Sequence, residues 1–336
     1  MDLKTLTEIN APSGHEQAIR RFLLDELKKL GFAPVLDRMG NVVAVKEGTG
    51  DAPRKRVMVS AHMDEVGLIV TSATEDGYLR IAAAGGIDPR VLVSKRVTVG
   101  EDKLPGVIGA VPIHLQSAAE RKHVLSMDEL LVDIGAKDKD EAERKAPMGT
   151  YISFDTPYVE YGDGFACGKA FDDRVGCLSL LRLLQEELPV DLVACFVSEE
   201  EVGCRGAKGA AFQQEPDIGI VLEGTTCNDL GDVPETAHVC EAGQGVAVSF
   251  MDGASIANRA LFRKALDVAK QENIPHQVKH SVSGGNDGGA IQRAREGVPV
   301  VVLSVPCRYI HSPSSVVKLS DVESQFALVK ALVKAL

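Results

Sequence analysis

Apolar and polar residues along the chain form patterns that predict alternating strands and helices. The runs at 56–61 and 191–197 are predominantly apolar, which is typical of strands buried on both faces of a parallel sheet. Apolar residues at helical spacing from Ile19 to Leu30 predict an amphipathic helix, and Ser13 and Glu16 before it have the spacing of a capping box. Further strands are expected at 41–46, 217–222, 244–251 and 298–305, and further helices from about 174 to 188, from 256 to 271 and from 321 to the end. This alternation favours the α/β fold class.

The pattern changes between residues 66 and 159. Short segments of alternating residues, such as 78–81 and 96–99, are separated by turns rich in glycine, proline and aspartate, and helical spacing is almost absent. We therefore predict a small β-rich domain over 66–159, inserted into a discontinuous α/β domain made of 1–65 and 160–336. The charged stretch 137–145 within the insert is expected to be a solvated loop or helix face.

Composition and charge exclude several classes of partner. The 336 residues carry a formal net charge of −11, so a nucleic-acid backbone or an anionic membrane surface would repel the chain. No apolar run approaches the roughly 20 residues that cross a membrane, and residues 1–8 lack the pattern of a secretory leader, so we expect a cytoplasmic protein. Seven scattered cysteines with no Cys-x-x-Cys pair suggest neither a disulfide framework nor a thiolate zinc site.

Acidic and histidine side chains follow several of the predicted strands, and their combination suggests a metal centre. They are His62 and Asp64, Asp172-Asp173, Glu199-Glu200-Glu201, Glu223 and His311. Each alone has a simpler explanation, as a structural histidine, acids at a helix N-terminus or a solvated loop. Together, imidazoles and carboxylates suit Zn²⁺, Co²⁺ or Mn²⁺, and a bridging carboxylate would hold two ions about 3.5–4 Å apart, as in a dinuclear hydrolase. Asp64 would orient the ring of a metal-bound His62.

The glycine-rich segment 284–289 precedes a short predicted helix. It lacks the Lys-Ser/Thr pair of a phosphate loop, so nucleotide binding is weakly supported. We expect a tight turn that lets the backbone approach the site.

Six segments, taken in order, resemble the glutamyl and tetrahedral aminopeptidases, a family of dinuclear metallopeptidases that also includes proteins named endoglucanase or deblocking aminopeptidase. The segments are Ala61-His62-Met63-Asp64-Glu65, Gly168-Lys169-Ala170-Phe171-Asp172-Asp173-Arg174, Glu200-Glu201-Val202-Gly203, Leu222-Glu223-Gly224, Gly284-Gly285-Asn286-Asp287 and Arg308-Tyr309-Ile310-His311-Ser312-Pro313. The resemblance spans nearly the whole chain. It implies a three-layer α/β/α phosphorylase/hydrolase-like domain, interrupted by a β-barrel-like domain that helps to form dimers, and a homo-oligomer that is commonly a dodecamer.

Carried over position by position, the resemblance also implies roles for individual residues. His62, Asp172 and Glu223 would bind one ion, while Asp172, Glu201 and His311 would bind the other, so that Asp172 bridges the two. Glu200 corresponds to the general base and Asp64 to the acid that orients His62. Two positions depart from the family pattern, because Glu223 is aspartate in many relatives and Asn286 often aligns with threonine, but neither change removes a ligand.

These expectations describe a metal-dependent aminopeptidase that acts on short peptides, in which Glu200 deprotonates a water activated by two metals. Three alternatives stay open. An N-deacylase or other amidohydrolase could use the same dinuclear site, and a catalytically silent assembly or binding protein could keep it. A glycosidase such as an endoglucanase could use two of the acids, but both histidines would then have no role and the chain has no tryptophan for stacking on sugars. The preferred N-terminal residue is not predicted.

Overall fold

A computed structural model describes residues 2–282 and 284–336, and within them eleven strands form one mixed sheet. In spatial order these strands are β1 (Val35–Leu36), β2 (Val42–Lys46), β12 (Asp191–Val197), β3 (Arg56–His62), β13 (Ile218–Thr226), β16 (Val300–Arg308), β17 (Ser315–Lys318), β11 (Phe165–Gly168) and β10 (Val159–Tyr161), with β14 (Val246–Ser249) beside β16 and β15 (His276–Val278) beside β14. The four central strands β12, β3, β13 and β16 are parallel. Their carboxyl ends therefore meet at one edge of the sheet, which is where open α/β sheets place their ligands.

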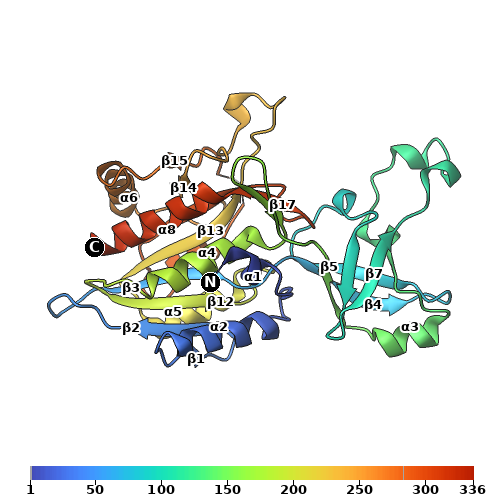
Figure 1. The fold of residues 1–336 in the computed structure, drawn as a ribbon, viewed down its shortest axis with the longest axis horizontal. Coiled ribbons are helices and arrows are strands. Elements are labelled where there is room, and N and C mark those ends of the chain that lie inside the picture. The colour runs from blue at the N-terminus through green and yellow to red at the C-terminus, as the bar shows by residue number, and fades with distance from the viewer. Residues whose placement is uncertain (1, 283) are drawn as a thin grey trace.

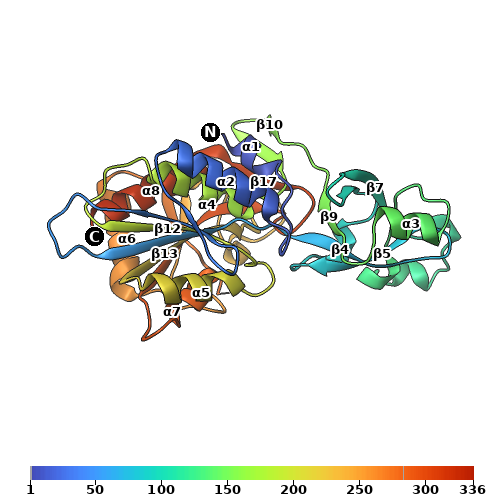
Figure 2. The same cartoon turned by 90° about the horizontal axis from the view of Figure 1, so that it is seen from below.

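Helices cover both faces of this sheet, as expected for three layers (Figure 2). One face carries α1 (Leu3–Thr7), α2 (Gln17–Lys29), α4 (Phe171–Leu183), α6 (Arg259–Gln271) and α8 (Leu319–Lys334), and the other carries α5 (Arg205–Gln214) and α7 (Asp287–Gln292). Successive strand residues alternate between the two cores, since Val57 and Val59 pack with the first set of helices and Met58 with the second. The central strands are mainly apolar because both faces are buried, and polar residues such as His62 and Glu223 occur toward their carboxyl ends.

A closed six-stranded barrel stands beside the sheet (Figure 1). Around the barrel the strands are β4 (Gly67–Ala73), β5 (Leu79–Ala84), β8 (Leu131–Asp133), β7 (Leu104–Gly109), β6 (Arg96–Val99) and β9 (Tyr151–Phe154), and the unit also carries α3 (Lys139–Lys145). Inward-facing residues such as Leu68, Ile81, Val97 and Val132 form its own buried core. The predicted fold class, an α/β/α sheet with a barrel-like insert, is confirmed, while the predicted domain limits of 66 and 159 stay a prediction.

Several local predictions need correction. Ser13 and Glu16 do not form a capping box, because α2 begins at Gln17 with no side-chain cap from Glu16, and the Ser13 hydroxyl donates to Asp64 Oδ2 at 2.6 Å. A buried carboxylate outcompeted the helix end for that hydroxyl. Helix α4 ends at Leu183, short of the predicted residue 188, and α6 begins after Asn258, whose side chain accepts hydrogen bonds from the first turn. Among the described residues, no helix has both the length and the apolar character needed to cross a membrane.

Candidate metal centre

The predicted site residues come from five separate places at the carboxyl edge of the sheet. His62 is the last residue of β3, Glu223 lies within β13, and Glu200 and Glu201 follow β12. Asp172 lies in the first turn of α4, where the peptide bond to Asp173 is cis, and His311 follows β16. Five of these side chains fall into two groups of three, and Asp172 belongs to both, whereas Glu200 belongs to neither.

The first group contains His62, Asp172 and Glu223. The His62 Nε2 atom lies 3.2 Å from Asp172 Oδ1 and 3.6 Å from Glu223 Oε2. On the other side of the ring, His62 Nδ1 lies 3.1 Å from the main-chain oxygen of Asp64 and 3.4 Å from its carboxylate Oδ1. A carbonyl oxygen only accepts, so Nδ1 donates to it, and the Nε2 atom is the one presented to the two acids.

The second group contains Asp172, Glu201 and His311. His311 Nε2 lies 3.2 Å from Glu201 Oε2 and 3.5 Å from Asp172 Oδ2. The two carboxylate oxygens of Asp172 thus face different histidines, and Oδ1 also accepts a hydrogen bond from the Gly224 amide at 3.2 Å. Asp172 is therefore shared by two groups of similar composition.

Asp64 also supports the turn that carries the glutamates, a role that the sequence did not reveal. Its carboxylate accepts hydrogen bonds from the amides of Glu200 at 3.1 Å and Glu201 at 3.2 Å, besides that from the Ser13 hydroxyl. The side chain is fully buried, so these bonds compensate for its lost hydration. Asp64 consequently links the His62 strand to the turn after β12.

The electrostatics of these two groups fit a divalent cation. Burial raises the pKa of Glu223 well above its usual range and that of Glu201 to about 8, and Glu223 Oε1 has no hydrogen-bond partner among the described residues. Burial opposes the charged form of His311, but the nearby Asp172 and Glu201 outweigh it and raise the pKa of His311 to about 9. The same opposition of burial and acidic neighbours leaves the pKa of His62 well above its usual range. A bound divalent cation would stabilise the ionised form of these neighbouring buried carboxylates, and a set of carboxylate and imidazole ligands suits Zn²⁺, Co²⁺ or Mn²⁺.

Glu200 lies beside this centre and belongs to neither group. It lines a cavity of about 260 Å³, and its Oε1 accepts a hydrogen bond from the Cys204 thiol at 3.3 Å. Burial raises its pKa above the usual range. Cys204, Glu200 and Asp287 form a third cluster, which was not anticipated; the Asp287 carboxylate is buried, and none of the described residues provides it with a hydrogen bond.

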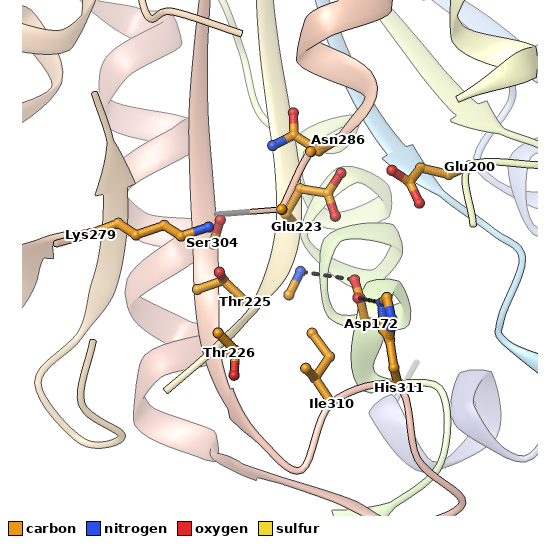
Figure 3. Close-up of a pocket in the computed structure, with 13 residues that line it drawn as sticks. Asp172, Glu200, Glu223, Thr225, Thr226, Lys279, Asn286, Ser304, Ile310 and His311 are labelled. Carbon is orange, nitrogen blue, oxygen red and sulfur yellow. Dashed lines mark hydrogen bonds and ion pairs between the residues drawn. The ribbon is translucent and has the colours of Figure 1, made fainter. Parts of the chain in front are cut away.

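The cavity joins the two groups to the glycine-rich turn (Figure 3). Gly284, Gly285 and Asn286 line its wall, and the Asn286 amide donates to Asp252 Oδ2 at 2.8 Å. Four further lining residues were missed by sequence reasoning: Lys279, Ser304, Thr225 and Thr226. Lys279 follows a strand of only three residues, so no sequence pattern marked its position.

The amino-acid sequence is similar to those of known aminopeptidases along nearly its whole length. A sequence model of the family described as M42 glutamyl aminopeptidase matches residues 40–328. The glutamyl aminopeptidase of Lactococcus lactis subsp. cremoris is 32% identical over 346 residues, covering 99% of this chain and 95% of the relative. The lysyl aminopeptidase of Pyrococcus furiosus is 33% identical over 345 residues, covering 99% of this chain and 96% of the relative.

Solved structures share the whole fold. The TET aminopeptidase from a marine sediment Thaumarchaeota archaeon aligns with a TM-score of 0.94 at 33% identity, covering 99% of this chain and 95% of that chain. The TET1 peptidase of Pyrococcus horikoshii, described as able to assemble into a tetrahedron or a large octahedral shell, aligns with a TM-score of 0.87 at 32% identity. That alignment covers 99% of this chain and 98% of the other.

Proposed function

Because this chain belongs to the M42 glutamyl aminopeptidase family, we propose that it is a dinuclear metalloaminopeptidase that removes N-terminal residues from short peptides. Membership of the family supports a peptide hydrolase. The observation that carries the finer proposal is the position of Asp172, whose two oxygens lie 3.2 Å and 3.5 Å from the histidines of two adjacent ligand groups. Carboxylates that bridge in this way are typical of two-metal hydrolases.

In this proposal His62, Asp172 and Glu223 hold one ion, and Asp172, Glu201 and His311 hold the other. Zn²⁺ or Co²⁺ suits these ligands best, and Mn²⁺ is a third choice. When bound, such a pair of ions polarises a scissile carbonyl and lowers the pKa of a water molecule.

In this proposal one residue of the protein transfers the proton of the attacking water, and another holds the site residues in position. Glu200 takes the proton of the attacking water and delivers it to the leaving amine, since its carboxylate lies in the cavity outside both ligand groups. The main-chain oxygen of Asp64 orients the His62 ring, and its carboxylate accepts a hydrogen bond from the Glu200 amide. Asp64 therefore fixes the distance between the general base Glu200 and the metal ligand His62. The cavity of about 260 Å³ is smaller than pockets for drug-sized ligands, about 300–1,000 Å³, which suits a single terminal residue.

The barrel at 66–159 is proposed as the dimerisation domain of a homo-oligomer that assembles into a dodecamer. The support is the likeness to TET1 of P. horikoshii, which is described as able to assemble into a tetrahedron or a large octahedral shell, and to the PhTET1-12s structure, which is described as a dodecamer. Light scattering after size exclusion should give the mass of twelve chains, and deletion of 66–159 with a short linker should leave smaller species. A monomer at micromolar concentration would contradict the proposal.

Metal removal and replacement combined with a substrate panel tests the activity. Protein stripped with EDTA should lose activity on aminoacyl p-nitroanilides and regain it with Zn²⁺, Co²⁺ or Mn²⁺, and N-acetylated analogues should stay intact. Release of acetate from the N-acetylated analogues, without release of p-nitroaniline from the free-amine substrates, would instead indicate a deacylase. Cellulose hydrolysis that survives EDTA would indicate a glycosidase, and a metal-loaded protein inactive on every peptide would indicate an assembly protein.

A further inference from the structure

The N-terminal segment 11–13 lies against the residues that follow β3. The Ser13 amide donates to the main-chain oxygen of Glu65 at 3.1 Å, and the Glu65 amide donates to the main-chain oxygen of Ala11 at 3.0 Å. The Ala11 amide also donates to Glu65 Oε1 at 2.8 Å. These bonds form a short parallel bridge at Glu65, so Ser13 is held beside the preceding residue, Asp64.

The barrel holds the same segment from its other side. The side-chain amide of Asn10 donates to Thr98 Oγ1 in β6 at 2.9 Å. The His15 ring stacks on Tyr151 of β9, with 5.0 Å between the ring centroids and 18° between the ring planes. The residues on either side of Ser13 are therefore fixed to the barrel, while Ser13 itself is fixed to the end of β3.

The Ser13 hydroxyl has one proton to donate, and it donates that proton to Asp64 Oδ2 at 2.6 Å. Ser13 is 4% exposed and Asp64 is fully buried, so the bond is shielded from competing water. Hydrogen bonds from a hydroxyl to a carboxylate at about 2.5–2.7 Å are short and charge-assisted. The bond consequently restrains the orientation of the Asp64 carboxylate.

Asp64 in turn contacts both parts of the proposed metal centre. Its main-chain oxygen accepts from His62 Nδ1 at 3.1 Å, and its carboxylate accepts from the amides of Glu200 and Glu201 at 3.1 Å and 3.2 Å. The Glu201 amide and the Ser13 hydroxyl share the same oxygen, Oδ2. Without the hydroxyl, that amide would be the remaining hydrogen-bond donor to Oδ2 among the described residues, and the carboxylate could rotate away from the turn.

We propose that Ser13 is a positioning residue of the metal centre, which acts through Asp64 to hold His62 and the turn at 200–201 at the spacing that two ions require. The inference rests on the dinuclear site of the proposed function. Ser13 belongs to neither ligand group, so its effect on metal binding passes through Asp64. Outer hydrogen-bond partners of metal ligands typically contribute about 10- to 100-fold in metal affinity.

The test measures the Zn²⁺ affinity of the metal-stripped chain by competition with a chromophoric chelator, without any substrate. Ser13→Ala should lower the affinity by about 10- to 100-fold, whereas Ser13→Thr keeps the hydroxyl and should bind Zn²⁺ nearly as tightly as the wild type. Ser324→Ala is the matched control. It also removes the hydroxyl of a buried serine, which donates to the main-chain oxygen of Ser320 within α8, and it should keep the wild-type affinity.

A double-mutant cycle shows whether Ser13 acts through Asp64. In an Asp64→Ala background, Ser13→Ala should change the Zn²⁺ affinity by less than about 2-fold, because the acceptor of the hydroxyl is already absent. Equal losses in the wild-type and Asp64→Ala backgrounds would show that Ser13 supports only the local fold, and would overturn the inference.

The outcomes separate this inference from the proposed function. Wild-type Zn²⁺ affinity in folded Ser13→Ala would overturn the inference and leave the dinuclear aminopeptidase intact. A wild-type chain that binds neither Zn²⁺ nor Co²⁺ would refute both. If Ser13→Ala does not fold, Ser13→Cys takes its place, because it keeps the shape of the side chain and offers only a weak thiol donor. Its Zn²⁺ affinity should fall, and an unchanged affinity would again overturn the inference.

Discussion

Exchanging Glu200 for glutamine removes a proton acceptor while keeping the shape of the side chain. The glutamine keeps the amide that donates to Asp64 Oδ1 at 3.1 Å, and its side-chain oxygen can still accept from the Cys204 thiol. The turn and its neighbour Glu201 should therefore stay in place, and metal binding should be preserved. The loss is confined to proton transfer, which contributes about 10²–10⁴-fold, or about 2.7–5.4 kcal/mol of barrier at 1.36 kcal/mol per tenfold.

Steady-state kinetics on the preferred aminoacyl substrate, with metal content measured by mass spectrometry, checks this expectation. We expect kcat to fall by about 10²–10⁴-fold with two metals still bound. Glu199→Gln is the control, because this neighbouring glutamate forms an ion pair with the exposed Arg205 and does not line the cavity. Wild-type turnover in Glu200→Gln would refute the assignment of the base, and loss of metal in that variant would show that Glu200 is a ligand.

Three further outcomes are expected. Asp172→Asn should lower bound metal to less than one ion per chain and abolish turnover, because the bridge serves both ligand groups; two bound ions with full activity would contradict this. Metal affinity should rise from about pH 7 to pH 9, because the pKa values of about 8 for Glu201 and about 9 for His311 mean that both side chains must lose a proton before they can bind a metal. Calorimetry in buffers of different ionisation enthalpy should detect the released protons. A metal affinity that does not change with pH would argue against these two residues as ligands. Lys169→Met should lower the free energy of unfolding by about 3–5 kcal/mol, because it removes the cation whose ammonium lies 2.7 Å and 2.8 Å from the buried Glu65 carboxylate and leaves that acid only the Ala11 amide and the more distant Arg174. Urea denaturation measures the loss, and Glu65→Gln in the same chain should restore part of it. Unchanged stability in the single variant would show that the ion pair is dispensable.

Much of the fold followed from local hydrophobic pattern. The central strands are buried on both faces, so the runs ending at Ala61 and Val197 identified β3 and β12 to within one residue. Strands β13 and β16 extend four and three residues past their predicted ends at 222 and 305. The capping box failed because the Ser13 hydroxyl bonds to Asp64, a residue 51 positions away. Sequence spacing cannot reveal competition between a helix end and a distant buried carboxylate.

The site residues that lie at the carboxyl ends of strands could be predicted from the sequence. His62 ends β3 and Glu200 and Glu201 follow β12, so parallel pairing of those strands brings them together. Lys279 and the supporting bonds of Asp64 to the glutamate turn were not predictable, because they depend on which strands neighbour each other across the sheet. Residues that act through tertiary neighbours leave no periodic signal in one sequence.

The central claim is that two ions share Asp172, and anomalous diffraction from crystals of the metal-loaded protein tests it most directly. Data on both sides of the metal absorption edge should show two peaks about 3.5–4 Å apart. One peak should lie among His62, Asp172 and Glu223, and the other among Asp172, Glu201 and His311. A single peak, or peaks that do not share Asp172, would contradict the account.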